Sequence, residues 1–286
     1  MPLMQSVQYQ EKSFRLLDLT AIHPSGNKYF KLKQNLQHAL DLGHHTILSF
    51  GGAWSNHIHA IAKLGEEEGL RTLGVIRGER PVQLSAMLME AEKSGMHLHF
   101  VPRDHYRALT RNEDGSKELS QTILDRFGEC YLIPEGGSNT AGVEGAGEIV
   151  KVLDELEVSY RHLFLPVGTG GTLAGIASKL IAEKHVTGIS ALKGAFDLNE
   201  TVERFAPGLS NWSIDHTAHL GGYAKCPDEL KRFILDFELT TGVSLEPVYT
   251  AKMIYRMLTL MDDEISSDEV IAIHTGGLQG RRGFDF

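Results

Sequence analysis

The sequence is poor in the features that mark disulfide-linked, membrane-spanning and nucleic-acid-binding proteins. It contains two cysteines in 286 residues, and the spacing of Cys130 and Cys226 fits neither a disulfide framework nor a metal site, which favours a reduced, cytoplasmic setting. No stretch approaches the ~18 consecutive apolar residues of a membrane span, and residues 1–6 lack the basic and apolar regions of a secretion signal. The net charge of -9 disfavours a nucleic-acid partner, because binding phosphates requires a basic surface. We therefore expect neither a membrane nor a nucleic acid as partner.

Two familiar site patterns are also incomplete. The 14 histidines include close pairs at residues 57/59 and 97/99, but no His-Glu-x-x-His run or acidic partner completes a metal site. We therefore expect no bound metal, and a metal-binding or non-catalytic protein remains an alternative of lower weight. A nucleotide-dependent oxidoreductase is disfavoured too, because Leu173 stands where a dinucleotide-binding loop has its third glycine.

Short apolar strands alternate with helical patterns along most of the chain, which is typical of βαβ units and parallel sheets. We expect strands at residues 14–20, 46–50, 71–76, 97–101, 130–134, 162–167, 189–193 and 270–274. We expect helices at residues 28–42, 58–69, 82–95, 118–127, 142–155, 172–183, 228–240 and after residue 248. The pattern predicts an α/β protein with two open, mostly parallel sheets flanked by helices. Residues 1–40 plus 138–286 would form the larger domain and residues 41–137 the smaller one, with the active site in the cleft between them.

Glycines cluster where three of the predicted strands end, and ligands bind at such carboxyl ends in open α/β sheets. The strongest cluster, between a strand and a helix, is Gly168, Thr169, Gly170, Gly171 and Thr172. Its backbone N–H groups, hydroxyls and helix dipole suit one terminal phosphate, although a tight turn without a ligand has the same sequence.

The other two clusters are weaker signals. In the segment 51–57, Ser55 and Asn56 fit either an ordinary helix cap or a site for a substrate carboxylate with a hydroxyl that shuttles a proton. His274-Thr275-Gly276-Gly277 gives support only, because a turn alone explains it.

Lys28 and Lys31 share one face of a helix that follows the turn Pro24-Ser25-Gly26-Asn27. Alone, this stretch reads as a helix start with two solvated lysines. Together with the predicted phosphate site and the predicted carboxylate site, this stretch indicates a lysine that binds pyridoxal 5'-phosphate (PLP) in a site for an amino-acid substrate. Desolvation or a neighbouring cation lowers the pKa of such a lysine, and Lys31 can be that cation.

Several of these motifs resemble a known family. They are Ser25-Gly26-Asn27-Lys28 with Lys31-Leu32, Gly51-Gly52-x-x-Ser55-Asn56-His57, and Gly168-Thr169-Gly170-Gly171-Thr172-x-x-Gly175. Further matches are Ile133-Pro134-x-Gly136-Gly137-Ser138-Asn139, Gly222-Tyr223, Glu246-Pro247-Val248-Tyr249-Thr250-x-Lys252 and His274-Thr275-Gly276-Gly277. In this order they resemble the 1-aminocyclopropane-1-carboxylate (ACC) deaminase/D-cysteine desulfhydrase family, PLP enzymes of fold type II with a tryptophan-synthase-β-like fold.

The resemblance implies a role for each matching residue. Lys28 would be the Schiff-base lysine, and Asn56 would bind the O3′ oxygen of PLP. Lys31 and the five residues from Gly168 to Thr172 would hold the phosphate. Tyr249 would stack on the pyridine ring of PLP, and the following residue, Thr250, would also contact the cofactor. Ser55, with Asn56 and His57, would bind the substrate carboxylate or move a proton, and Tyr223 would line the substrate side.

The resemblance also implies an activity, with one part left open. It implies a deaminase or lyase, active as a homodimer, that converts a small amino acid to a 2-oxo acid and ammonia; a different β-elimination or a racemisation is the alternative. Thr250 stands where ACC deaminases typically have Glu, which favours the D-cysteine desulfhydrase branch. Phe30, Lys33 and Trp54 depart from the family pattern, so the substrate is not fixed by the resemblance.

Overall fold

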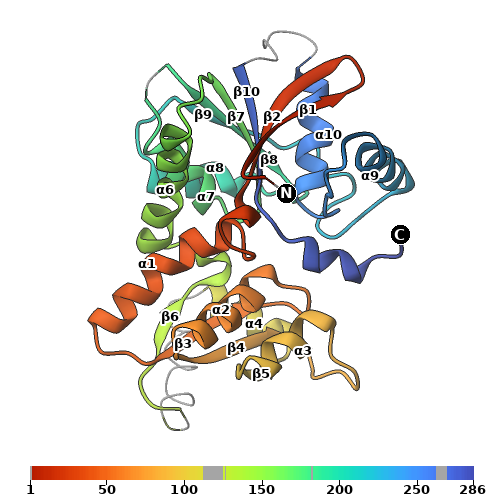
Figure 1. The fold of residues 1–286 in the computed structure, drawn as a ribbon. Helices are drawn as coiled ribbons and strands as arrows, with labels where there is room; N and C mark the ends of the chain where they lie inside the picture. The colour runs from red at the N-terminus through yellow and green to blue at the C-terminus, as the bar shows by residue number, and fades with distance from the viewer. Residues whose placement is uncertain (1, 112–124, 126, 182, 262–268) are drawn as a thin grey trace.

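Two sheets with helices on both faces make up the fold in the computed structural model, which describes residues 2–111, 125, 127–181, 183–261 and 269–286 (Figure 1). The larger sheet has the strand order β1 (Met4–Tyr9), β2 (Lys12–Asp18), β10 (Val270–His274), β7 (His162–Val167), β8 (His185–Ser190), β9 (Trp212–Asp215). The first two strands pair antiparallel and the other neighbours pair parallel. The smaller sheet is parallel throughout, in the order β5 (His97–Val101), β4 (Arg71–Arg77), β3 (Thr46–Gly51), β6 (Tyr131–Ile133).

Helices bury both faces of each sheet. On one face of the larger sheet lie α6 (Thr140–Glu155), α7 (Gly171–Ala177) and α8 (Asp197–Phe205), and on the other lie α9 (Asp228–Thr241) and α10 (Thr250–Leu260). The smaller sheet packs against α2 (Asn56–Glu67) and α3 (Ala86–Lys93) on one face and against α4 (Arg103–Arg111) on the other. The central strands β3, β7 and β10 are therefore almost continuously apolar and buried.

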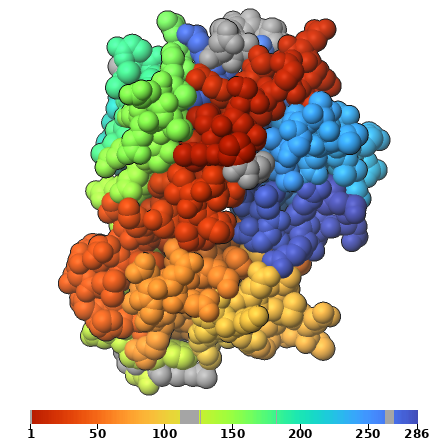
Figure 2. All heavy atoms as spheres, in the orientation of Figure 1, coloured from red at the N-terminus to blue at the C-terminus, as the bar shows by residue number. Residues whose placement is uncertain are grey.

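Helix α1 (Asn27–Asp41) joins the two halves of the molecule. Phe30 packs into the core of the larger sheet, whereas Leu32, Leu36 and Ala39 pack into the core of the smaller one. A second link lies near the C-terminus, where Arg282 Nη1 contacts Glu90 Oε1 at 2.5 Å. Figure 2 shows this blue C-terminal segment against the orange-yellow segment that contains α3.

In each sheet the order in which successive strands are added reverses at a central strand, β3 in the smaller sheet and β7 in the larger one. This reversal places the loops that follow these strands close together. In the smaller sheet β4 and β5 follow β3 on one side and β6 returns to its other side. In the larger sheet β8 and β9 follow β7 on one side and β10 returns to its other side. Such switch points open a crevice at the carboxyl ends of the strands. The loops after β3, β6, β7 and β10 therefore converge.

The main strands and helices match the sequence-based expectations, with the following corrections. The strand expected at residues 14–20 lies at residues 12–18, where it forms a hairpin with β1, which was not expected, and pairs with β10 on its other side. The strand expected at residues 189–193 lies at residues 185–190. Three elements were not expected: α4, α8 and the edge strand β9. These are short and rich in charged or polar residues, so they lack a long apolar run.

Two expectations are not decided by these elements. The helix expected at residues 118–127 falls mostly outside the described residues. The division into residues 1–40 plus 138–286 and residues 41–137 stays a prediction. Among the described helices, none is both long and apolar enough to cross a membrane.

Candidate active site

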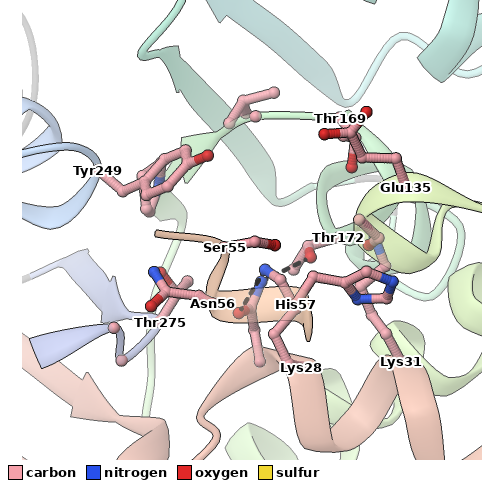
Figure 3. Close-up of a pocket in the computed structure, with 18 of the residues that line it drawn as sticks. Lys28, Lys31, Ser55, Asn56, His57, Glu135, Thr169, Thr172, Tyr249 and Thr275 are labelled. Carbon is pink, nitrogen blue, oxygen red and sulfur yellow. Dashed lines mark hydrogen bonds between the residues drawn. The ribbon is translucent and has the colours of Figure 1, made fainter. Parts of the chain in front are cut away.

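A cavity of about 410 Å³ lies where the loops of the two sheets converge (Figure 3). Its walls come from the start of α1 and from the loops after β3, β6, β7 and β10. In Figure 3, Lys28 and Lys31 point into it from α1, Tyr249 lies opposite, and Thr169 and Glu135 lie together on another side. The volume is in the usual range for a small-molecule site.

The backbone at Gly26 fixes where Lys28 enters the cavity. Gly26 has φ 56° and ψ -132°, and a Cβ there would lie 2.2 Å from the carbonyl oxygen of Thr275. Only glycine fits this close approach, which joins the start of α1 to the loop after β10. Lys28 Nζ donates to Asn27 Oδ1 at 3.2 Å, and Asn27 Nδ2 donates to Thr172 Oγ1 at 2.9 Å.

The pKa of the Lys28 amine lies close to neutral pH. Removal from water lowers its pKa to about 8, and the nearby Glu246 carboxylate opposes this shift. A lysine with this pKa is a nucleophile and a base in the ordinary range of cellular pH, unlike a solvated lysine.

Lys31 is a buried amine, with 1% of its surface exposed. Its Nζ donates to the carbonyl oxygen of Gly136 at 2.5 Å and to Ser138 Oγ at 2.9 Å. Burial, and then the charge of Lys28, hold the pKa of Lys31 well below its usual value. Because neither contact is a carboxylate, an anion in the cavity would stabilise the charged amine.

The glycine-rich turn after β7 lies directly beside Lys31. A Cβ on Gly171 would lie 2.8 Å from Lys31 Nζ and 2.6 Å from Ser138 Oγ, so only a bare backbone fits there. Ser138 Oγ and Thr169 Oγ1 are hydrogen-bonded at 2.6 Å. The backbone, the hydroxyls and the amine thus surround one end of the cavity with donors, as a phosphate requires.

The loop after β3 caps α2 and faces the cavity at the same time. Ser55 Oγ accepts a hydrogen bond from the amide of Ile58 at 3.2 Å, so the ordinary helix cap is present. Asn56 also lines the cavity, and its buried Oδ1 has no partner among the described residues. The free first-turn N–H groups of α2 suit a carboxylate.

His57 is a buried neutral imidazole. Ser49 Oγ donates to the carbonyl oxygen of Ile133 at 2.7 Å, so it accepts from His57 Nε2 at 2.9 Å. This arrangement leaves Nδ1 unprotonated, and Nδ1 has no partner among the residues that the structure describes. Burial, and then the charges of Lys28 and Lys31, hold the pKa of His57 well below its usual value.

Two tyrosines lie on the side of the cavity opposite the lysines. The rings of Tyr249 and Tyr223 meet edge to face, with centroids 6.2 Å apart. Burial raises the pKa of both phenols, most strongly for Tyr249. Both therefore remain protonated at ordinary pH and can donate a proton.

A buried carboxylate holds Tyr249 in place. Glu246 accepts from the amides of Val248, Tyr249 and Thr250 at 2.8, 2.5 and 2.6 Å. The Thr250 hydroxyl accepts from the Glu246 amide at 3.0 Å and is fully buried. Thr250 is thus part of this turn and is not among the residues that line the cavity.

Most of the predicted site residues converge on this cavity. Those that line it are Lys28, Lys31, Ser55, Asn56, His57, Gly168, Thr169, Gly170, Thr172, Tyr223 and Tyr249. Gly171 lies immediately behind Lys31. The sequence interpretation assigned no role to Arg77 and Glu135, which also line the cavity. The available signal was their position, because Arg77 ends β4 and Glu135 follows β6.

The residues present fit PLP. The donor-rich end suits its phosphate, and Lys28 suits its aldehyde. The side-chain amide of Asn56, whose Oδ1 has no partner among the described residues, suits a polar substituent of the ring. Tyr249 provides an aromatic face for the ring on the opposite side of the cavity.

Comparisons with known proteins agree with PLP as the cofactor. The family model described as pyridoxal-phosphate dependent enzyme matches residues 23–276. The bifunctional D-cysteine desulfhydrase/1-aminocyclopropane-1-carboxylate deaminase of Arabidopsis thaliana is 29% identical over 296 residues, covering 92% of this chain and 71% of that protein. D-cysteine desulfhydrase of Serratia proteamaculans is 25% identical over 278 residues, covering 91% of this chain and 84% of that protein.

A solved structure agrees on the fold. The crystal structure of an ACC deaminase homologue has a TM-score of 0.80 at 22% identity and covers 97% of this chain and 89% of that chain. This likeness confirms the predicted fold class of two mostly parallel sheets flanked by helices.

Proposed function

The chain belongs to the pyridoxal-phosphate dependent enzyme family, and from this premise we propose a deaminase or lyase that converts a small amino acid to a 2-oxo acid and ammonia. The observation that carries the proposal is Lys28, whose pKa of about 8 and position beside a donor-rich cavity end suit a cofactor-binding lysine. When bound, PLP supplies an electron sink that weakens the bonds at the α-carbon of the substrate.

We assign the residues of the cavity to separate tasks. Lys31 with the segment from Gly168 to Thr172 binds the phosphate, Asn56 binds the ring oxygen, and Tyr249 covers the ring face. Ser55 and the first turn of α2 orient the substrate carboxylate.

Proton transfer is assigned to the groups with perturbed pKa values. Lys28, neutral above pH about 8, accepts the proton that leaves the substrate carbon. The phenols of Tyr223 and Tyr249 stay protonated, and one of them donates its proton to the product or to the leaving group.

The substrate is tested by a panel assay on the purified, PLP-loaded protein. Thr250 is neutral and tied to the Glu246 turn, which favours elimination of a good leaving group such as sulfide. We expect D-cysteine and water to give pyruvate, sulfide and ammonia faster than ACC gives 2-oxobutyrate and ammonia. Formation of neither set of products from a coloured, PLP-loaded protein would refute the substrate assignment while leaving the cofactor assignment intact.

The lowered pKa of Lys28 predicts how fast the apo-protein takes up PLP. Because only the neutral amine attacks a carbonyl, the initial rate should rise about tenfold per pH unit below pH 8 and become flat above it. The rate is read from the growth of visible absorbance after mixing, at a fixed low PLP concentration. A rate that climbs steadily to pH 10 would show that Lys28 has the pKa of an ordinary solvated lysine.

On the basis of the sequence resemblance we also propose a cytoplasmic homodimer. Light scattering of the purified protein tests the dimer, and a mass equal to one chain at micromolar concentration would contradict it.

A further inference from the structure

We propose that Arg77 selects substrates that carry a second anionic group on the side chain, a carboxylate or its equivalent. The inference rests on the proposed function, because it concerns the substrate of the same site. Among small amino acids, it predicts a preference for those with an acidic side chain over their uncharged counterparts.

Arg77 lies at the junction of two cavities. Beside the main cavity lies a second one of about 220 Å³, and the shared walls include Gly52, Ser55, Arg77, Tyr223 and Tyr249. A Cβ on Gly52 would lie 3.2 Å from Arg77 Nη2, so the guanidinium rests on the loop that carries Ser55. A substrate held by this loop would therefore have its side chain within reach of Arg77.

Arg77 has no carboxylate partner among the residues that the structure describes. Besides the loop at Gly52, it contacts an aromatic ring, since its guanidinium carbon lies 5.5 Å from the centroid of the Tyr106 ring. Other arginines of the chain are paired: Arg256 binds Asp215 at 2.7 Å and Arg80 binds Glu92 at 2.7 Å. An arginine that faces a ligand cavity without a carboxylate partner is suited to bind an anion from solution.

The two acidic side chains that line these cavities form no ion pair with Arg77 among the described residues. Glu135 also lines the main cavity, but it forms no ion pair with Arg77 in the described structure. Glu246 borders the second cavity, but its oxygens accept three backbone amides. An anionic group is therefore favoured at the Arg77 side of the junction.

The second cavity leaves room for a side chain longer than that of cysteine. Beyond Arg77 the second cavity continues between Trp54, Val248 and Phe284. The first turn of α2 and Ser55 already provide donors for the α-carboxylate of any amino acid. A guanidinium in addition to these donors is explained by a second anion on the substrate.

Isosteric pairs of amino acids test this inference on the PLP-loaded protein. Aspartate is compared with asparagine and glutamate with glutamine, as both enantiomers, and affinity is read from the change in visible absorbance on titration. We expect the acidic member of at least one pair to bind about tenfold more tightly, with the preference decreasing at high salt. Arg77→Gln should remove the preference while the amide binds as before, and Arg77→Lys should restore part of it.

Arg80→Gln is the matched control, because it removes the same charge from a nearby arginine that is paired with Glu92 and does not line the cavity. It should leave the preference unchanged. The inference is overturned if the wild type binds both members of each pair equally, or if no amino acid of the set changes the spectrum. It is also overturned if Arg77→Gln weakens both members equally, because Arg77 would then serve the α-carboxylate or the fold. Failure of the proposed function looks different, because the protein would not acquire visible absorbance with PLP.

Discussion

Lys28→Ala is expected to lower kcat/KM by roughly a thousandfold or more, because it removes both the nucleophile that binds the cofactor and the base that accepts the substrate proton. The variant should keep its fold, since Lys28 is only partly buried and its single hydrogen bond goes to the neighbouring Asn27. Visible absorbance after addition of PLP and removal of free cofactor is the direct measurement. After borohydride treatment, mass spectrometry of peptides should locate the modified lysine at residue 28 in the wild type.

Lys33→Ala provides the control for this experiment. Lys33 lies on the same helix, but its side chain is 54% exposed and its ion pair with Glu148, at 3.5 Å, faces solvent. Its loss should change neither the spectrum nor the rate. If borohydride still fixed the cofactor to a lysine in Lys28→Ala, the assignment of Lys28 would be wrong.

The sequence was most informative where chemistry and local structure coincide. Lys28 and Lys31 are one helical turn apart, so the prediction of a helix is enough to place both amines on one face. Likewise, the glycines at residues 168, 170 and 171 follow a strand that is apolar from Leu163 to Val167, and this pattern predicts both the strand and the turn. These local patterns are enough to predict the parallel sheets and the donor-rich end of the cavity.

The sequence was least informative where tertiary packing decides. Arg77 reads as an ordinary polar strand end, and only the pairing of β4 with β3 places it beside Gly52. Thr250 was predicted to contact the cofactor, a prediction that no comparison tests, and its hydroxyl is bound to the backbone of Glu246. No local sequence pattern indicates that the buried carboxylate of Glu246, four residues before Thr250, accepts the hydrogen bonds that hold this turn.

Lys31→Met is expected to have opposite effects on cofactor affinity and on the stability of the apo-protein. Affinity for PLP should fall about a hundredfold, because charge-assisted hydrogen bonds to the phosphate are lost. The free energy of unfolding of the apo-protein should rise by up to about 1 kcal/mol, because a buried amine near Lys28 is replaced by an apolar side chain of similar length.

The hydrogen bonds that Lys31→Met removes set the size of the stability gain. Ser138 keeps its bond to Thr169, at 2.6 Å, but the Gly136 carbonyl loses its contact with Lys31. One unmet carbonyl costs about 1–2 kcal/mol, which offsets much of the benefit from removing a buried charge.

The pH dependence of the apo-protein separates these two contributions. The pKa of Lys31 is lower in the folded protein than in the unfolded chain, so its protonated form opposes folding. This cost is complete below the folded pKa and disappears as the pH rises toward the unfolded value of about 10.5. The advantage of methionine should therefore be larger at pH 6 than at pH 9, as measured by urea unfolding of both apo-proteins.

Lys33→Met, on the exposed side of the same helix, should change neither cofactor affinity nor the pH dependence of stability. If Lys31→Met instead destabilised the apo-protein by several kcal/mol at both pH values, Lys31 would be chiefly a structural link between Gly136 and Ser138. Opposite signs for affinity and apo stability are expected of an amine that is buried in order to bind an anion, because only the bound phosphate compensates its charge.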